Sequence, residues 1–216
     1  MTKSIPTTIQ KQKLLLVEGI DDKDFFIVLL RKVGITDVQI ISVDGKTNFK
    51  SILQIVASIE GFSLLTHIGV VRDADTDAKG AFDSIANSLT KIGLTPPSKG
   101  NTFRIDDIGV SVGIFIMPRK FEEGMLEDLC MESVRKHTII PCIDDFVKCI
   151  EKNLTTAEQP KNVSKMKSQV FLAAMPEMVN SIGLGAKKGY WDFDDSCMDD
   201  IKDFLKNFIQ AHLPPQ

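Results

Sequence analysis

The stretch IGVVRDADTD, residues 68–77, decides the fold, because an apolar run passes directly into acidic residues. A short apolar run bounded in this way is typical of a buried strand. The run Leu14–Val17 is built alike and passes into Glu18. In a parallel sheet, the carboxyl ends of neighbouring strands open onto one crevice, where ligands bind. If the two strands are neighbours, Glu18, Asp73 and Asp75 converge on that crevice.

The acidic residues at these strand ends predict a metal site. Carboxylates held close together are costly unless a divalent cation neutralises them. Asp73 and Asp75 stand two positions apart, so in an extended backbone their side chains point the same way and can reach one ion. Hard carboxylate oxygens suit Mg²⁺ or Mn²⁺ rather than zinc. We therefore predict Asp73 and Asp75 as principal ligands, with Glu18 as a further ligand or a general base.

Strands alternate with helices in the first half of the chain. This alternation predicts an α/β fold, with a parallel sheet of about four strands and helices on both faces. Beyond residue 125 the pattern predicts helices only, the last of them over 198–212 and one over 165–181 that Pro176 interrupts. We expect an α/β core over residues 11–125 and a helical extension over 126–216 that packs on it.

Composition bounds the classes of function. The chain has 216 residues, of which 43% are hydrophobic and 25% charged, as in ordinary globular proteins. No apolar run approaches the ~20 residues of a membrane span, and Met1–Pro6 lacks the apolar segment of a signal peptide. The four cysteines show no Cys-x-x-Cys spacing. We expect a cytoplasmic protein without membrane association. The net charge of −3 argues against a broadly basic nucleic-acid binder and leaves a local basic groove open.

Other interpretations of these motifs fit poorly. An EF-hand loop starting at Asp73 needs Gly and Glu where the chain has Ala78 and Ser84. The run Asp73–Asp77 also resembles the Asp-x-Asp-x-Thr motif on the first strand of haloacid-dehalogenase-type phosphatases. Here, however, Asp77 occupies the position of the Thr, and the run follows the third strand. Gly45–Thr47 resembles the end of a P-loop, but the first glycine of that pattern would fall at Ile40, inside a strand.

The strand-end motifs together resemble the Toprim domain of topoisomerases, bacterial primases and OLD-family nucleases. The residues that carry the resemblance are Val17–Phe26, Val71–Asp75, Met117–Pro118, Gly124–Leu129 and Lys165–Lys167. The chain is most similar to an uncharacterised bacterial Toprim-like family related to the OLD nucleases. The resemblance implies a Toprim fold and Mg²⁺- or Mn²⁺-dependent chemistry on nucleic acid or nucleotide. Many OLD proteins carry an ATPase module that this sequence lacks, which leaves room for a separate ATPase partner.

The resemblance adds further residues to the predicted site. It implies that Asp22 and Glu127 complete the metal site. Asp22 fits equally well as a helix cap, and Glu127 as part of an acidic helix start that complements the helix dipole. Lys46 at a strand end, and Lys167 in a helix that opens near Lys165, would steady a scissile phosphate. Each lysine is also compatible with a solvated surface position.

Two hypotheses of function follow. The first is a metal-dependent, nuclease-like enzyme that cleaves phosphodiesters. The second is a non-catalytic module that keeps the metal crevice to bind a nucleotide or a partner protein. The acidic charge balance favours the module, and the full acidic set favours the enzyme, because a pure binding module has no need of Glu18. The sequence does not distinguish DNA from RNA and does not indicate an oligomeric state.

Overall fold

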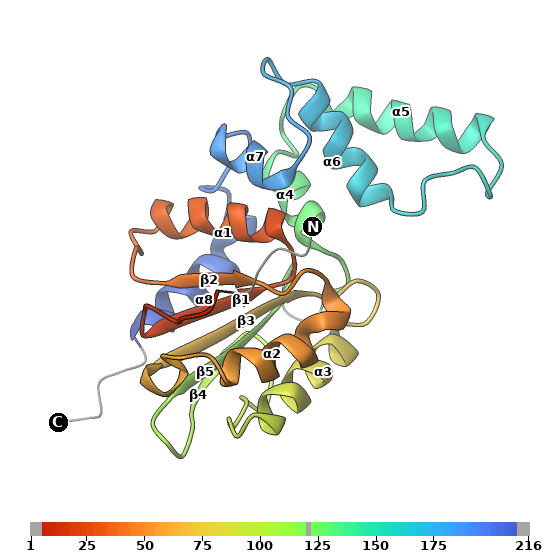
Figure 1. Ribbon diagram of the computed structural model, residues 1–216. Coiled ribbons are helices and arrows are strands. Elements are labelled where there is room, and N and C mark those ends of the chain that lie inside the picture. Colours follow the sequence, from red (N-terminus) through yellow and green to blue (C-terminus); the bar gives the residue numbers. More distant parts are fainter. Residues whose placement is uncertain (1–5, 120–121, 211–216) are drawn as a thin grey trace.

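One mixed sheet of five strands forms the centre of the computed structural model, which describes residues 6–119 and 122–210 (Figure 1). The strands are β1 (Lys13–Val17), β2 (Gln39–Ser42), β3 (His67–Asp73), β4 (Thr102–Ile105) and β5 (Ser111–Met117). Their order in the sheet is β2-β1-β3-β5-β4. β1, β2, β3 and β5 pair in parallel, as predicted, and β4 is antiparallel to β5. Residues 1–5 and the predicted helix end at His212 lie outside the described residues.

Helices cover both faces of this sheet, which confirms the predicted fold class (Figure 1). The α-helices are α1 (Ile20–Lys32), α2 (Phe49–Ala57), α3 (Ala78–Lys91), α4 (Leu126–Ser133), α5 (Ile140–Asn153), α6 (Val163–Ala173), α7 (Ile182–Lys187) and α8 (Asp199–Gln210). Short 3₁₀ turns are η1 (Lys46–Asn48), η2 (Phe62–Leu64) and η3 (Ser196–Met198). The apolar sides of α2 and α3 pack on one face, and α1 and α8 on the other. Because the parallel strands are covered on both sides, they read as continuous apolar runs.

The edge strand β4 was not predicted, and a contact with a glycine explains how it docks. Phe103 of β4 lies over Gly113 of β5, where an added Cβ would come 2.1 Å from the phenyl ring. The same ring stacks on Phe204 of α8 at a centroid distance of 4.5 Å. The missing side chain at Gly113 therefore leaves the space in which the edge strand and the C-terminal helix meet.

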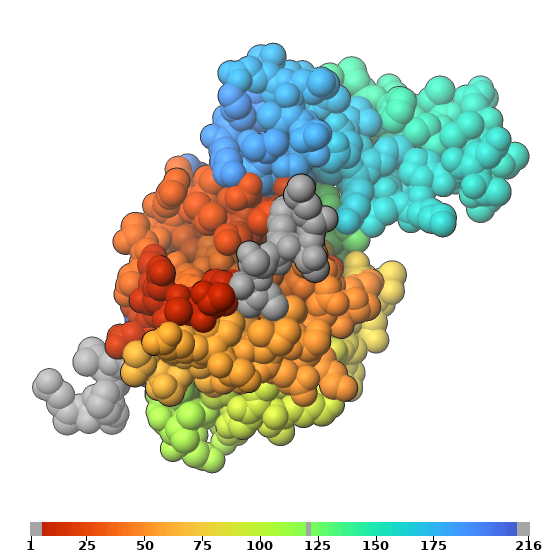
Figure 2. Space-filling model, in the orientation of Figure 1, coloured from red at the N-terminus to blue at the C-terminus, as the bar shows by residue number. Residues whose placement is uncertain are grey.

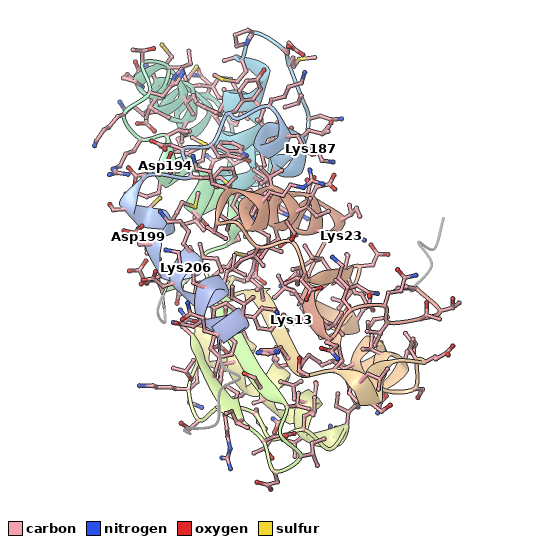
Figure 3. All side chains as sticks on the ribbon, turned by 90° about the vertical axis from the view of Figure 1, so that its left-hand side faces the viewer. Lys13, Lys23, Lys187, Asp194, Asp199 and Lys206 are labelled. Carbon is pink, nitrogen blue, oxygen red and sulfur yellow. The ribbon has the colours of Figure 1, made fainter. Side chains whose placement is uncertain are left out.

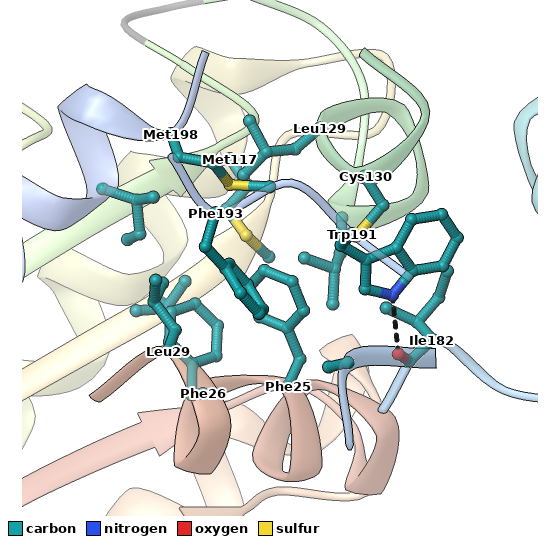
Figure 4. Close-up of a cluster of buried hydrophobic side chains, with 14 of the residues drawn as sticks. Phe25, Phe26, Leu29, Met117, Leu129, Cys130, Ile182, Trp191, Phe193 and Met198 are labelled. Carbon is teal, nitrogen blue, oxygen red and sulfur yellow. Dashed lines mark hydrogen bonds between the residues drawn. The ribbon is translucent and has the colours of Figure 1, made fainter. Parts of the chain in front are cut away.

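The chain beyond residue 125 is helical, as predicted, with no strand among its described residues. α4, α7 and α8 pack with α1 in one hydrophobic cluster. α5 and α6 project from the body as a hairpin, and Ile143, Phe171 and Leu172 join the hairpin to the same cluster (Figures 1 and 2). Figure 4 shows the centre of the cluster, where Trp191 donates a hydrogen bond to the Ile182 carbonyl at 2.9 Å. The predicted helix over 165–181 is shorter than expected. α6 ends at Ala173, because Pro176 has no amide hydrogen to continue the helix and disfavours the helical conformation at Met175.

The cluster contains residues from both predicted parts of the chain, for example Phe25 of α1 and Phe208 of α8. The division at residue 125 stays a prediction. Among the described residues, no helix has the length and apolar character that crossing a membrane requires.

Candidate metal and phosphate site

The candidate site lies where the strand order reverses. β1 leads through α1 to β2 on one side, and β3 pairs with β1 on the other. The carboxyl ends of β1 and β3 therefore lie side by side at a topological switch point, the usual place of ligand crevices in such sheets. Glu18 follows β1 and Asp73 ends β3. The expectation that these two strands are neighbours is confirmed.

A pocket of about 310 Å³ opens at this switch point. We call it the acidic pocket. Of the predicted site residues, Glu18, Asp22, Asp73 and Glu127 line it. Its other lining residues are Gly19, Ile20, Asp21, Asp44, Gly45, Leu126, Lys165 and Ile182. The structure thus brings together residues from three strand ends and from the first turns of four helices.

Asp22 serves both the start of α1 and the acidic pocket. The N-cap of α1 is Gly19 rather than Asp22. One carboxylate oxygen of Asp22, Oδ2, accepts a hydrogen bond from the Gly19 amide at 3.1 Å, which satisfies a free donor at the helix start. The other, Oδ1, is buried without a hydrogen-bond partner. Burial, with the nearby charges of Glu18 and Glu127, raises the pKa of Asp22 to about 6.

Asp73 is the innermost carboxylate. Its Oδ1 accepts a hydrogen bond from the Leu126 amide at 3.0 Å, in the first turn of α4, where the helix dipole favours a negative charge. Burial raises the pKa of Asp73 well above its ordinary value, and the charges of Asp22, Glu18 and Glu127 raise it further. The structure therefore places Asp73 within electrostatic reach of every other predicted ligand in the pocket.

Glu18 and Glu127 complete the buried acidic set. Burial raises the pKa of both carboxyl groups. Oε2 of Glu18 is buried without a hydrogen-bond partner. Glu127 is one residue past Leu126 in α4, and its Oε1 lies 3.8 Å from the ammonium of Lys165. A buried, unsatisfied carboxylate oxygen is costly in a native structure, so each such oxygen marks a position suited to bind a cation.

Asp75 lies at the rim and does not line the pocket. β3 ends at Asp73, and Asp75 has a positive φ of 51°, so the extended backbone assumed for this pair does not hold. The backbone of Asp75 pairs with Gly124 through two hydrogen bonds, at 2.8 and 2.7 Å. Its carboxylate accepts a hydrogen bond from Lys46 at 2.6 Å. The charge of Asp75 still raises the pKa of Glu18, so the rim remains electrostatically joined to the pocket.

The structure separates the two lysines of α6. Lys165 lines the acidic pocket, whereas Lys167 pairs with Asp144 of α5 at 2.9 Å and lines a different cavity. Residues two apart on a helix lie on nearly opposite faces, because each residue turns the helix by about 100°. The lysine that faces the predicted ligands is therefore Lys165, not Lys167.

Further charged residues at or near the site were not predicted, among them Asp21, Asp44 and Arg72. Asp44 lines the acidic pocket just beyond β2, at a strand end like those of Glu18 and Asp73. Arg72 immediately precedes Asp73, and its charge opposes the rise of the Glu18 pKa. The Arg72 guanidinium lies 5.9 Å from the ring centroid of Phe49, a cation–π contact, and does not line the pocket. Position at a strand end was the available signal for Asp44.

The donor chemistry of the acidic pocket fits a hard divalent cation. All its candidate ligands are carboxylates, two of which carry a buried oxygen without a partner. Within residues 6–119 and 122–210, however, no group of three or more His, Cys, Asp or Glu side chains is already arranged around an ion position. Binding a cation would therefore require these side chains to close around it.

Comparisons with known proteins extend this description. No curated protein is similar enough to this chain to count as a match. Among solved structures, the C-terminal region of the OLD protein of Xanthomonas campestris pv. campestris aligns with 94% of this chain and 97% of its own, at 13% identity and a TM-score of 0.49. The C-terminal region of the Burkholderia pseudomallei OLD protein aligns with 94% of this chain and 100% of its own, at 13% identity and a TM-score of 0.47.

A protein-family model covers most of this chain. One family model matches residues 12–210, which include every described strand and helix. The chain therefore belongs to the family described as "Protein of unknown function (DUF3226)".

Proposed function

We propose that the protein is a Toprim-like, Mg²⁺- or Mn²⁺-dependent enzyme that cleaves phosphodiesters. The observation that carries the proposal is the acidic pocket, where buried carboxylates with unpartnered oxygens gather at the switch point. Glu18, Asp22, Asp73 and Glu127 would hold the cation, with Asp75 joining from the rim. A bound divalent cation would supply Lewis-acid activation of water and charge neutralisation at the phosphate.

The protein residues divide the remaining work. Glu18 is suited to accept the proton of an attacking water, because its Oε2 is buried in the pocket wall without a hydrogen-bond partner. Water oxygen bonds to phosphorus, the bond from phosphorus to the leaving sugar oxygen breaks, and that oxygen takes a proton from solvent. Lys165 and Lys46 lie where each could pair with a phosphate oxygen once a cation has replaced them beside the carboxylates.

A cleavage assay tests this proposal. Purified protein is incubated with single- and double-stranded DNA and RNA, with Mn²⁺ or with EDTA, beside Asp73→Asn. We expect metal-dependent cleavage that Asp73→Asn abolishes. Glu18→Gln should cost on the order of 10²–10⁴-fold in rate, since it removes a proton acceptor. Lys46→Ala should cost less, because a lysine contributes one point charge. Absence of cleavage of all four substrates would refute the enzyme.

The alternative function is a non-catalytic module that binds a nucleotide or a partner protein through the same crevice. The ion pairs favour it, because Lys46 and Lys165 already compensate Asp75 and Glu127 without a metal. Nucleotide binding that depends on Asp73 and Mn²⁺, in protein that cleaves none of the four substrates, would support the module. A separate ATPase partner is compatible with either function and would be sought by co-purification.

A further inference from the structure

A second pocket, beneath α1, is lined by positive side chains and by no acidic one. It has a volume of about 500 Å³, and its charged lining residues are Lys11, Lys23 and Arg31. We call it the basic pocket. In Figure 3, Lys23 lies on the lower side of α1, whereas Lys187 of α7 lies above that helix. In a chain with a net charge of −3, a cavity with three cations and no acid is a local departure from the overall balance.

One wall of the basic pocket is a single face of α1. Lys23, Ile27, Leu30 and Arg31 recur at the spacing of one helical face and all line the pocket. Eight residues of α-helix place the Cα atoms of Lys23 and Arg31 about 12 Å apart. The wall therefore presents a cation at each end and apolar surface between them.

The opposite wall holds a fixed ammonium group. Lys11 donates hydrogen bonds to the carbonyl oxygens of Thr36 at 2.7 Å and Val38 at 3.3 Å. An ammonium has three donors, so the third is left for a ligand. Gln39 is also held in place, because its amide accepts a hydrogen bond from the Gln10 backbone and donates one to the Thr8 carbonyl. This wall is thus arranged before any ligand arrives.

The charges of the basic pocket are not compensated by the protein. Among the described residues, no ion pair involves Lys23 or Arg31. Of the acids near them in sequence, Asp22 lines the acidic pocket, and two others pair with lysines outside the basic pocket. Asp24 pairs with Lys187 at 2.6 Å, and Asp37 lies 3.7 Å from Lys13. Like charges around one cavity repel, and a bound anion removes that repulsion.

We propose that the basic pocket binds a mononucleotide-sized organic phosphate. Lysine and arginine are the side chains that pair with phosphate oxygens, and Ile27, Leu30 and Ile40 offer an apolar surface for a flat ring. The volume lies within the ~300–1,000 Å³ of small-molecule sites. The inference does not rest on the proposed function, because these residues line a different cavity from the acidic pocket.

Fluorescence titration with a methylanthraniloyl-labelled ADP tests the proposal in full-length protein. The titration is done in EDTA at low salt, so that no cation in the acidic pocket can draw phosphate there. The test variant is Lys23→Ala with Arg31→Ala. The matched control is Lys50→Ala with Lys91→Ala, which removes the same charge from exposed positions on α2 and α3, across the sheet.

We expect the wild type and the control pair to bind the probe alike, and the test pair to bind at least about tenfold more weakly, since removing one charge-assisted hydrogen bond to phosphate weakens binding by roughly that factor or more. Unlabelled ADP should compete better than adenosine or inorganic phosphate alone. No binding by the wild type, or equal weakening in both pairs, would overturn the site. Competition by an oligonucleotide but not by ADP would overturn the assignment of a single nucleotide. In each case the Mn²⁺-dependent cleavage assay gives an independent result for the acidic pocket.

Discussion

Replacing Lys46 by methionine should tighten the binding of Mn²⁺ rather than weaken it. Lys46 occupies Asp75 with a contact of 2.6 Å, so a cation that recruits Asp75 has to break that ion pair. The Lys46 side chain is 51% exposed and that of Asp75 30%, so the pair itself is worth only ~0.2–1 kcal/mol. Repulsion between the single charge of Lys46 and the double charge of Mn²⁺ ~4 Å apart in water adds about 2 kcal/mol. Together these costs, about 2.2–3 kcal/mol, correspond to an affinity for Mn²⁺ roughly 40- to 150-fold higher in Lys46→Met.

The assay is a titration of Mn²⁺ in which electron paramagnetic resonance measures the free ion. Lys50→Met is the control, because it makes the same change of charge at an exposed position of α2. Equal or weaker Mn²⁺ binding by Lys46→Met would refute the idea that Lys46 competes with the cation. A wild type that binds no Mn²⁺ would instead remove the metal site itself. Cleavage should respond in the opposite direction, since Lys46 is also proposed to face phosphate.

Three further predictions concern the pH dependence of stability, the packing of α7 on α1, and Lys165 of α6. Without metal, the pKa of Asp22 is about 6 in the folded protein against an ordinary value of 3.8, so the folded state binds the proton more tightly than the unfolded state. The free energy of unfolding should therefore rise as the pH falls from 7 to 4, and Asp22→Asn should reduce this rise by at most about 3 kcal/mol. Urea titrations measure the rise, and an equal rise in wild type and Asp22→Asn would contradict the prediction. Gly183→Ala would place a Cβ 2.4 Å from the Cβ of Asp24 in α1 and should destabilise the folded protein by ~1–3 kcal/mol. Gly100→Ala is the control, because a Cβ there meets its nearest atoms at an ordinary 3.7 Å, and equal shifts of the melting temperature in the two variants would refute the prediction. Lys165→Ala should lower the cleavage rate more than Lys167→Ala, and the reverse order would show that α6 is placed wrongly.

The strands of the sheet were predictable where a local sequence pattern is enough to specify a strand. The buried parallel strands carry apolar runs such as Leu14–Val17, and Glu18 and Asp73 follow from their positions at strand ends. β4 was not predictable in this way, because only Thr102 and Phe103 of its residues are partly buried and the strand exists by pairing with β5. The docking of Phe103 over Gly113 is a long-range fit that no local pattern contains.

The details of the site also depend on long-range contacts, and on which face of a helix each residue occupies. Lys165 and Lys167 differ only in helical phase, and the phase is set by Asn162, whose side chain caps α6. α7 is six residues long and contains Gly183 and Gly185, so its sequence resembles a loop. Its glycines allow the close approach to α1 and to Trp191 that stabilises the helix. The extended backbone assumed at Asp75 was wrong, because Asp75 adopts a positive φ, a conformation that Asp tolerates better than most residues but that its local sequence does not require.

The packing of α8 on the sheet has a consequence for biosynthesis. β5 ends at Met117 and α8 begins at Asp199, about 80 residues later. At ~5–20 residues per second, the ribosome makes this stretch in roughly 4–16 s. During that time the strand face that Phe208 covers at Gly69 has no lid from α8. We expect nascent chains stalled before Asp199 to be sensitive to protease and to recruit chaperones, and chains released with α8 to be resistant.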